Sequence, residues 1–204
     1  EVQSLFQSWE HPGLYPLMYW ALFKLVNYLL VPALVIKLVL RERLIDQGLT
    51  GTHDRRIWLL YLAMLAVVMP LVWYVSDDPA FLSRYPKYAG AAGSWEELIL
   101  FELSYGLQFF LLEYFFRGYT LFALARWFGH AAIFVMVVPY TMIHFGKALP
   151  ETLGSIIAGI ALGTLSLRTR SIYGGVIIHC AVAWSMDGFA MWHKGELGKL
   201  LAGN

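Results

Sequence analysis

"WEELILFELSYGLQFFLLEYFFRGYTLF", residues 95–122, decides the fold class of this chain. Apolar side chains dominate the stretch from Leu98 onward. A helix needs roughly 20 predominantly apolar residues to cross the hydrocarbon core of a bilayer. Because the stretch exceeds this length, it predicts a helix that spans a membrane rather than a helix of a soluble domain.

The composition of the whole chain agrees with that prediction. Of its 204 residues, 59% are hydrophobic and 14% are charged, and the mean hydropathy is +0.59. A soluble globular domain is nearer one-quarter charged. The net charge of +1 gives no indication of a nucleic-acid partner, and the single cysteine, Cys180, excludes a disulfide framework and a cysteine-rich metal site.

Six apolar segments follow one another along the chain, and we expect each to be a membrane-spanning helix. Segments this long are not strands of a barrel, so we expect an all-α, polytopic transmembrane helical bundle of about six spans, forming a single integral membrane domain over residues 1–204. The second, fourth and fifth segments are short and are expected to extend into their flanks or to tilt. The segments are about Leu14–Leu40, Ile57–Tyr74, about Trp95–Phe122, Ala131–Ile143, Thr152–Leu167 and Ile172–Trp192.

The basic residues of the loops predict how the segments are oriented. Loops that follow odd-numbered segments carry more of them than loops that follow even-numbered segments. By the positive-inside rule, the odd loops lie in the cytoplasm and both termini lie outside. The odd loops hold Arg41, Arg43, Arg55, Arg56, Arg126, Arg168 and Arg170, and the even loops hold Arg84, Lys87 and Lys147.

An acid and a base stand close together inside the third segment. Glu113 and Arg117 are four residues apart, so they meet on one surface of a helix. They are either a self-neutralising pair that brings a polar patch into the membrane, or a carboxylate that arginine keeps ionised for accepting a proton from water. Ionisable residues in spans are costly, and two leucines would replace the pair more cheaply, which favours the functional interpretation.

Two histidines extend this candidate site. His144 stands in "VVPYTMIHFGK" and His179 in "GGVIIHCAVAW". Alone, His144 could be an interfacial histidine and His179 a buried neutral one. One glutamate and two histidines on three spans form a better candidate, and the same residue types make up a catalytic zinc site with an open position. Because the local spacing H-E-x-x-H is absent, glutamate-based chemistry and zinc-based chemistry both stay open.

Small residues recur every four positions in the fifth segment. Ser155, Gly159 and Gly163 therefore share one face of a helix. Such a face lets a second helix approach closely, so it predicts helix packing rather than chemistry.

Three of these motifs, taken in order, resemble the CPBP family of intramembrane proteases. The motifs are "EYFFRG", "YTMIH" and "GGVIIHCAVA", and the apolar block "GIALGTLSLRTRSIYGGVIIH" is also similar to the family. The family includes CAAX prenyl-protein proteases and bacteriocin-processing or immunity-related (ABI) enzymes. Its pattern is Glu-Glu-x-x-x-Arg, Phe-x-x-x-His and His-x-x-x-Asn or Asp on three core helices. The resemblance covers about residues 95–190, which it implies to be the catalytic core.

The resemblance assigns positions residue by residue. Glu113 falls on the second family glutamate, Arg117 on the arginine, and His144 and His179 on the two histidines, with Tyr140 at the aromatic position. Two positions depart from the pattern. Leu112 stands where the family has its first glutamate, and Ala183 stands where it has asparagine or aspartate.

The resemblance implies an intramembrane endopeptidase of a prokaryotic plasma (inner) membrane. Its substrate would be a membrane-associated or lipid-anchored protein. Glu113 would activate water, Arg117 would fix Glu113, His144 would position the water, and His179 would donate to the oxyanion. The alternative is a catalytically inactive membrane scaffold or immunity-type binding protein, which Leu112 and Ala183 favour.

Overall fold

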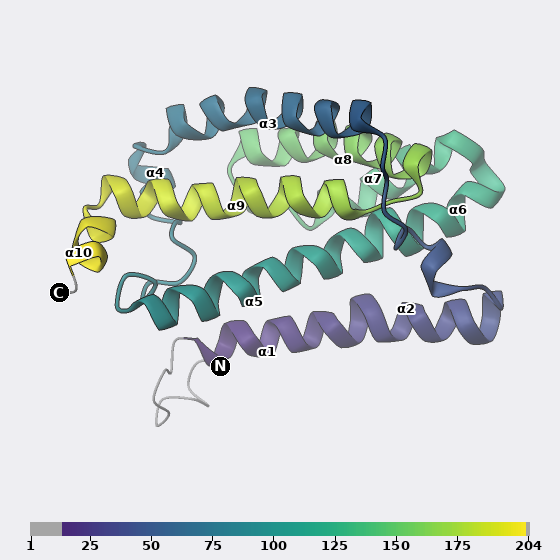
Figure 1. Cartoon of the computed structure of the whole chain (residues 1–204), viewed down its shortest axis with the longest axis horizontal. Helices are drawn as coiled ribbons and strands as arrows, with labels where there is room; N and C mark the ends of the chain where they lie inside the picture. The colour runs from purple at the N-terminus through teal and green to yellow at the C-terminus, as the bar shows by residue number, and fades with distance from the viewer. Residues whose placement is uncertain (1–13, 203–204) are drawn as a thin grey trace. The chain divides into compact units, whose positions relative to one another are not determined.

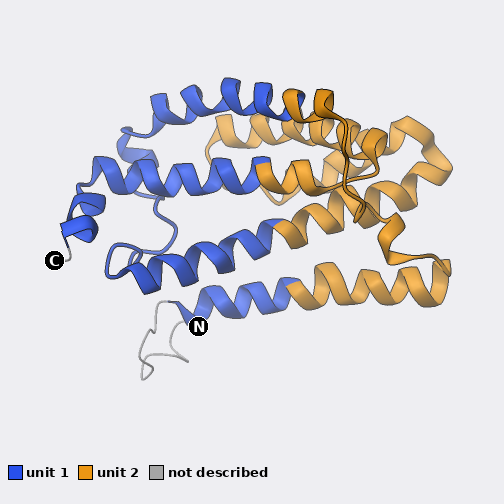
Figure 2. Ribbon diagram, viewed as in Figure 1, with its two compact units in different colours: residues 1–24, 60–109, 178–204 blue, residues 25–59, 110–177 orange. Residues whose placement is uncertain are grey.

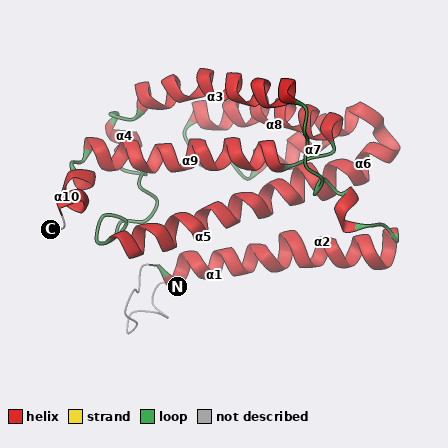
Figure 3. Cartoon of the chain, viewed as in Figure 1, coloured by secondary structure: helices red, strands yellow, loops and turns green. Residues whose placement is uncertain are grey.

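The computed structural model describes residues 14–202. Within that range every regular element is a helix, and Figure 3 shows these helices joined by loops without a strand. The β-type pairing found there is an isolated bridge between Leu49 and Ser171. The prediction of an all-α helical bundle is therefore confirmed.

The first part of the chain alternates between α-helix and π-helix before a single long α-helix, α3. Figure 1 labels α1, α2 and α3 in this part. The left-handed residue Arg41 ends the first helical stretch. The elements in order are α1 (Tyr15–Lys24), the π-helix η2 (Leu25–Leu30), α2 (Val31–Leu34), the π-helix η3 (Val35–Leu40), the 3₁₀ turn η4 (Leu44–Asp46), α3 (Arg55–Val75) and the short α4 (Pro79–Leu82).

The second part of the chain contains all the candidate site residues. It includes a third π-helix, which follows α5 without a break. Its elements are α5 (Trp95–Glu113), the π-helix η5 (Tyr114–Thr120), α6 (Leu121–Phe128), the 3₁₀ turn η6 (Gly129–Ala131), α7 (Ala132–Met142), α8 (Leu149–Thr169), α9 (Tyr173–His193) and α10 (Glu196–Ala202).

Five helical stretches of the described chain are long and apolar enough to cross a membrane. They cover all six predicted segments, because the stretch Trp95–Met142 is 48 residues long and contains both the third and the fourth. At 1.5 Å per residue, such a length is about twice the thickness of the hydrocarbon core. Gly129, with φ 54° and ψ −132°, ends α6 and divides the stretch. The second and fifth segments extend into their flanks as α3 and α8.

The chain falls into two compact units, coloured blue and orange in Figure 2. The described part of unit 1 comprises residues 14–24, 60–109 and 178–202, and unit 2 comprises residues 25–59 and 110–177. Unit 2 therefore holds three of the four predicted site residues, and His179 belongs to unit 1.

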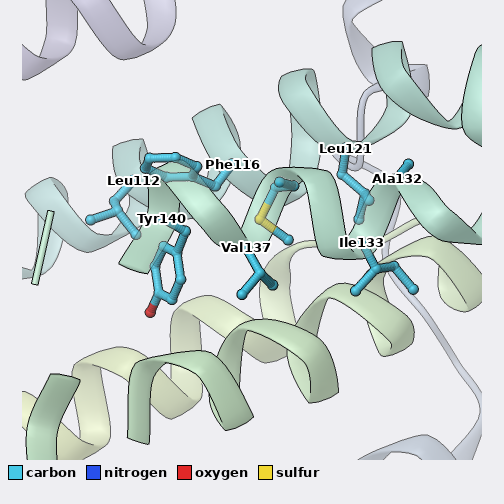
Figure 4. Close-up of a cluster of buried hydrophobic side chains, with 8 residues drawn as sticks. Leu112, Phe116, Leu121, Ala132, Ile133, Val137 and Tyr140 are labelled. Carbon is cyan, nitrogen blue, oxygen red and sulfur yellow. The ribbon is translucent and has the colours of Figure 1, made fainter. Parts of the chain in front are cut away.

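The core of unit 2 is a cluster of buried apolar side chains from the end of α5, η5, α6 and α7 (Figure 4). The small-residue face of α8 packs against another helix, as its sequence predicts, and this helix is α7. A Cβ atom on Gly159 would come within 2.9 Å of Val137 Cγ2, and one on Gly163 within 3.0 Å of Met136 Cε. Both glycines therefore allow α7 and α8 to approach closely.

Unit 1 has its own core at the start of α5 and the end of α9. Phe101 and Met191 are buried in it together with Tyr88 and Ala91 from the loop before α5. Asp187 of α9 is also fully buried, and its Oδ1 accepts a hydrogen bond of 2.9 Å from the backbone N–H of Lys87. This carboxylate therefore fixes the same loop.

Candidate active site

The ion pair of the third segment lies where an α-helix becomes a π-helix. Glu113 is the last residue of α5, and Arg117 lies within η5. Both side chains are 0% exposed, and Arg117 Nη1 donates to Glu113 Oε1 at 2.7 Å. π-Helical turns inside α-helices are rare and occur frequently at functional sites. The local geometry thus marks the same two residues that the sequence selects.

The second oxygen of Glu113 lies against a glycine at the start of α9. A Cβ atom on Gly175 would come within 2.5 Å of Glu113 Oε2 and 3.2 Å of its Cδ. Real Cβ atoms do not approach so closely, so this position leaves room for the carboxylate only because it is glycine. Sequence reasoning did not assign Gly175 a role, although it stands in the quoted motif "GGVIIHCAVA".

Arg117 is held on two further sides. Its guanidinium carbon lies 3.8 Å from the centroid of the Tyr140 ring, within the range of a cation–π interaction. Its backbone carbonyl accepts a hydrogen bond of 3.1 Å from Ser166 Oγ of α8. Among the residues that the structure describes, its Nε and Nη2 have no hydrogen-bond partner. The arginine is thus positioned by one hydrogen bond to Glu113, by the tyrosine ring and by its own backbone.

His144 lies in the turn after α7 and is 6% exposed. Its Nδ1 is 3.0 Å from the backbone oxygen of Tyr140. A carbonyl oxygen only accepts, so Nδ1 carries the proton, and in the neutral ring Nε2 is then the acceptor. Thr152 Oγ1 donates to the backbone oxygen of His144 at 3.0 Å, which ties this turn to α8.

Tyr140 connects the histidine with the ion pair. Its ring contacts the His144 ring edge-to-face at a centroid distance of 4.9 Å, and the same ring also lies against the Arg117 guanidinium. Figure 4 shows the tyrosine beside Leu112 and Phe116 in the apolar cluster. The structure thus brings Glu113, Arg117 and His144 into one connected set of contacts within unit 2.

His179 lies on α9 in unit 1. Its ring stacks on that of Phe109, with a centroid distance of 4.4 Å and an interplanar angle of 25°. Its convergence with Glu113 and His144 stays a prediction.

The two positions that depart from the family pattern are both buried and apolar. Leu112 is 6% exposed and packs in the apolar cluster of unit 2. Ala183, on α9 of unit 1, is also 6% exposed and carries only a methyl group. The side chains at these two positions therefore offer neither a proton acceptor nor a hydrogen-bond donor.

The zinc alternative would need a group of side chains that could act as ligands. A catalytic zinc is held by three protein ligands. Over residues 14–202, no three histidine, cysteine, aspartate or glutamate side chains are grouped so that they could hold a metal ion.

Comparison with known proteins identifies the same part of the chain. Residues 94–185 match the family described as "Type II CAAX prenyl endopeptidase Rce1-like". This match confirms the resemblance to the CPBP proteases, and the matched residues include Glu113, Arg117, His144 and His179. No curated protein and no solved structure gives a match. The protein is thus an integral membrane protein, and its residues 94–185 are similar to a protease family.

Proposed function

We propose that this protein is an intramembrane endopeptidase and that residues 95–190 form its catalytic core. The observation that carries the proposal is the fully buried ion pair of Glu113 and Arg117 within the segment similar to CAAX endopeptidases. Its substrate would be a membrane-associated or lipid-anchored protein, and its location a prokaryotic plasma membrane. The family's own activity supports the first of these, because CAAX endopeptidases act on lipid-modified proteins.

Glu113 would act as the general base. Its carboxylate removes a proton from water while the water oxygen attacks the carbonyl carbon of the scissile bond, and the proton then passes to the leaving amine. Arg117 supports this role because a cation at 2.7 Å favours the ionised form of the acid. No covalent bond to the enzyme is formed. Water must reach the carboxylate between the helices, since the bilayer core holds none.

The histidines would act on the water and on the carbonyl oxygen. His144 has its Nδ1 proton engaged by the Tyr140 carbonyl, so Nε2 can accept a hydrogen bond from the attacking water and orient it. His179 would donate to the oxyanion, where a preorganised donor contributes most to catalysis. With leucine at position 112, Glu113 would work without the neighbouring glutamate of the family.

The second candidate is a membrane scaffold or immunity-type binding protein without catalytic activity. The burial of Leu112 in an apolar cluster and the methyl group of Ala183 favour it. The ion pair argues against it, because a buried pair of charges contributes little stability relative to apolar residues of similar volume.

The test is the substitution Glu113→Gln, with Glu96→Gln as the matched control. Glu96 is an exposed glutamate in the first turn of the same helix. Membranes from cells that express each variant are compared for new polypeptide termini by mass spectrometry. We expect the wild type and Glu96→Gln to generate the same termini and Glu113→Gln to generate none while accumulating in the membrane. Identical termini from Glu113→Gln would refute the proposed base, and no termini from the wild type would support the scaffold.

A further inference from the structure

Unit 2 contains a pocket of about 570 Å³ that is separate from the ion pair. Charged side chains dominate its polar lining, and basic ones outnumber acidic ones. They are Arg41, Arg43, Arg126, Arg170, Glu42 and Asp46. They come from the segment that runs from the end of η3 to the end of η4, from α6 and from the residue directly after α8.

Two of the four arginines already have partners. Arg126 forms an ion pair with Glu42, and Arg170 Nη2 donates to the backbone oxygen of Asp46 at 2.9 Å. Arg41 and Arg43 are exposed, and within residues 14–202 their side chains form no hydrogen bond and no ion pair. The pocket thus offers two uncommitted guanidinium groups, which match the oxygens of a phosphate by their planar, forked geometry.

The backbone of this pocket is strained where its arginines lie. Arg41 (φ 55°) and Arg170 (φ 54°) are the non-glycine residues of the described chain with positive φ. They cap η3 and α8, a position that glycine or asparagine usually occupies because other side chains clash there. Strained residues cluster at functional sites. A function for the side chains of Arg41 and Arg170 would account for the backbone strain at both positions.

The pocket lies at the level where the spans end. Two candidate spans end at Leu40 and Thr169, directly before the two strained arginines. Beside Arg126, the rings of Trp127 and Phe128 are exposed, as is typical of aromatic residues at a membrane interface. The side chains of Phe122, Ala125 and Leu167 form the apolar part of the lining of the pocket. The pocket therefore combines a basic part with an apolar wall.

We propose that this pocket binds the phosphate of an anionic phospholipid head group. Arg41 and Arg43 contact the phosphate oxygens, Arg170 completes the basic wall, and the first carbons of the acyl chains lie along Phe122 and Leu167. Basic pockets between membrane-spanning helices are known to bind such head groups. Free inorganic phosphate shares the charge but has no apolar part, so the apolar wall favours the lipid.

The test measures lipid-induced stabilisation of the full chain in neutral detergent. Thermal unfolding is followed with added phosphatidylglycerol, with phosphatidylcholine or with inorganic phosphate, and native mass spectrometry detects the lipid that stays bound. We expect only phosphatidylglycerol to raise the melting temperature and to remain bound. An equal shift with phosphatidylcholine or with inorganic phosphate would overturn the proposal.

Matched variants assign the effect to the pocket. The double substitution Arg43→Gln with Arg41→Gln should abolish the shift, and Arg168→Gln should retain it. Arg168 is exposed and stands two residues before Arg170 but does not line the pocket. If the double variant keeps the full shift, or if Arg168→Gln loses as much of it, the assignment is wrong.

The variant Arg41→Gly distinguishes an effect on lipid binding from an effect on the stability of the protein. Glycine adopts the left-handed conformation without a clash, so this variant should melt at a higher temperature than the wild type in the absence of lipid. Its phosphatidylglycerol shift should nevertheless be reduced, because a guanidinium is gone. A purely structural arginine would not produce this opposite pair of effects, and an undiminished shift in this variant would contradict the proposal.

Discussion

The carboxylate of Glu113 and the backbone of Gly175 are in direct contact, so that a Cβ atom on Gly175 would stand 2.5 Å from Glu113 Oε2. The proposed general base is thus positioned from two places in the sequence, by Arg117 on its own helix and by the start of α9. This contact makes the base sensitive to a change as small as one methyl group.

Gly175→Ala should therefore displace Glu113 and lower the generation of new termini at least about tenfold. Misplacement of a reacting group by about 1 Å can lower a reaction rate by far more than this. The matched control is Gly188→Ala on the same helix, where a Cβ atom would have nothing within 4 Å. The control should process normally and be as stable as the wild type or more so. Full processing by Gly175→Ala would show that Glu113 does not depend on this contact.

Removing one partner of the ion pair should lower the stability of the protein more than removing both partners. Arg117→Met leaves Glu113 buried without its cation and should lower the free energy of unfolding by about 3–5 kcal/mol. Combining it with Glu113→Leu should restore most of that loss, because two apolar side chains of similar volume need no partner. Unfolding in mixed detergent micelles measures both values. Neither variant should generate termini, and a single variant as stable as the double variant would contradict the prediction.

Tyr140 should act through its ring rather than its hydroxyl group. Tyr140→Phe keeps the ring beneath Arg117 and beside His144, so activity and stability should stay near those of the wild type. Tyr140→Leu removes the cation–π interaction, which contributes about 0.5–2 kcal/mol, and also disturbs the apolar cluster. Melting temperature and processing are measured together for both. If Tyr140→Phe is inactive while remaining folded, the hydroxyl group takes part in the reaction.

Leu112→Glu tests whether the missing glutamate could simply be restored. Leu112 packs among apolar residues, so a carboxyl group there should cost a few kcal/mol of stability and bring no gain in processing. Leu112→Met conserves volume and should cost less than about 1.5 kcal/mol. A Leu112→Glu variant that folds normally and cleaves faster would place this position in the site.

The parts of the fold that depend on local sequence could be predicted. Long apolar runs determine where the spanning helices lie, and the spacing of Ser155, Gly159 and Gly163 predicts a face for close packing. The partner helix of that face, α7, could not be predicted, because it depends on tertiary structure. The π-helical geometry of Tyr114–Thr120 also has no marker in residue type or spacing.

Some contacts of the candidate site could likewise be predicted from the sequence, and others could not. The contact between Glu113 and Arg117 follows from a spacing of four residues, so the sequence predicts it. The contact with Gly175 and the ring between Arg117 and His144 arise only when distant segments pack. The left-handed conformation of Arg41 and Arg170 could not be foreseen either, since the usual residue at such a position is glycine.

The ion pair also bears on how the protein enters the bilayer during biosynthesis. Glu113 and Arg117 are one turn apart, so they can neutralise each other as soon as their helix forms, before any other span has inserted. An unpaired arginine or aspartate at the centre of a span costs the insertion machinery about 2.5–3.5 kcal/mol. We therefore expect the pair to enter the lipid as an electrically neutral unit, with both charges in place before the other spans insert.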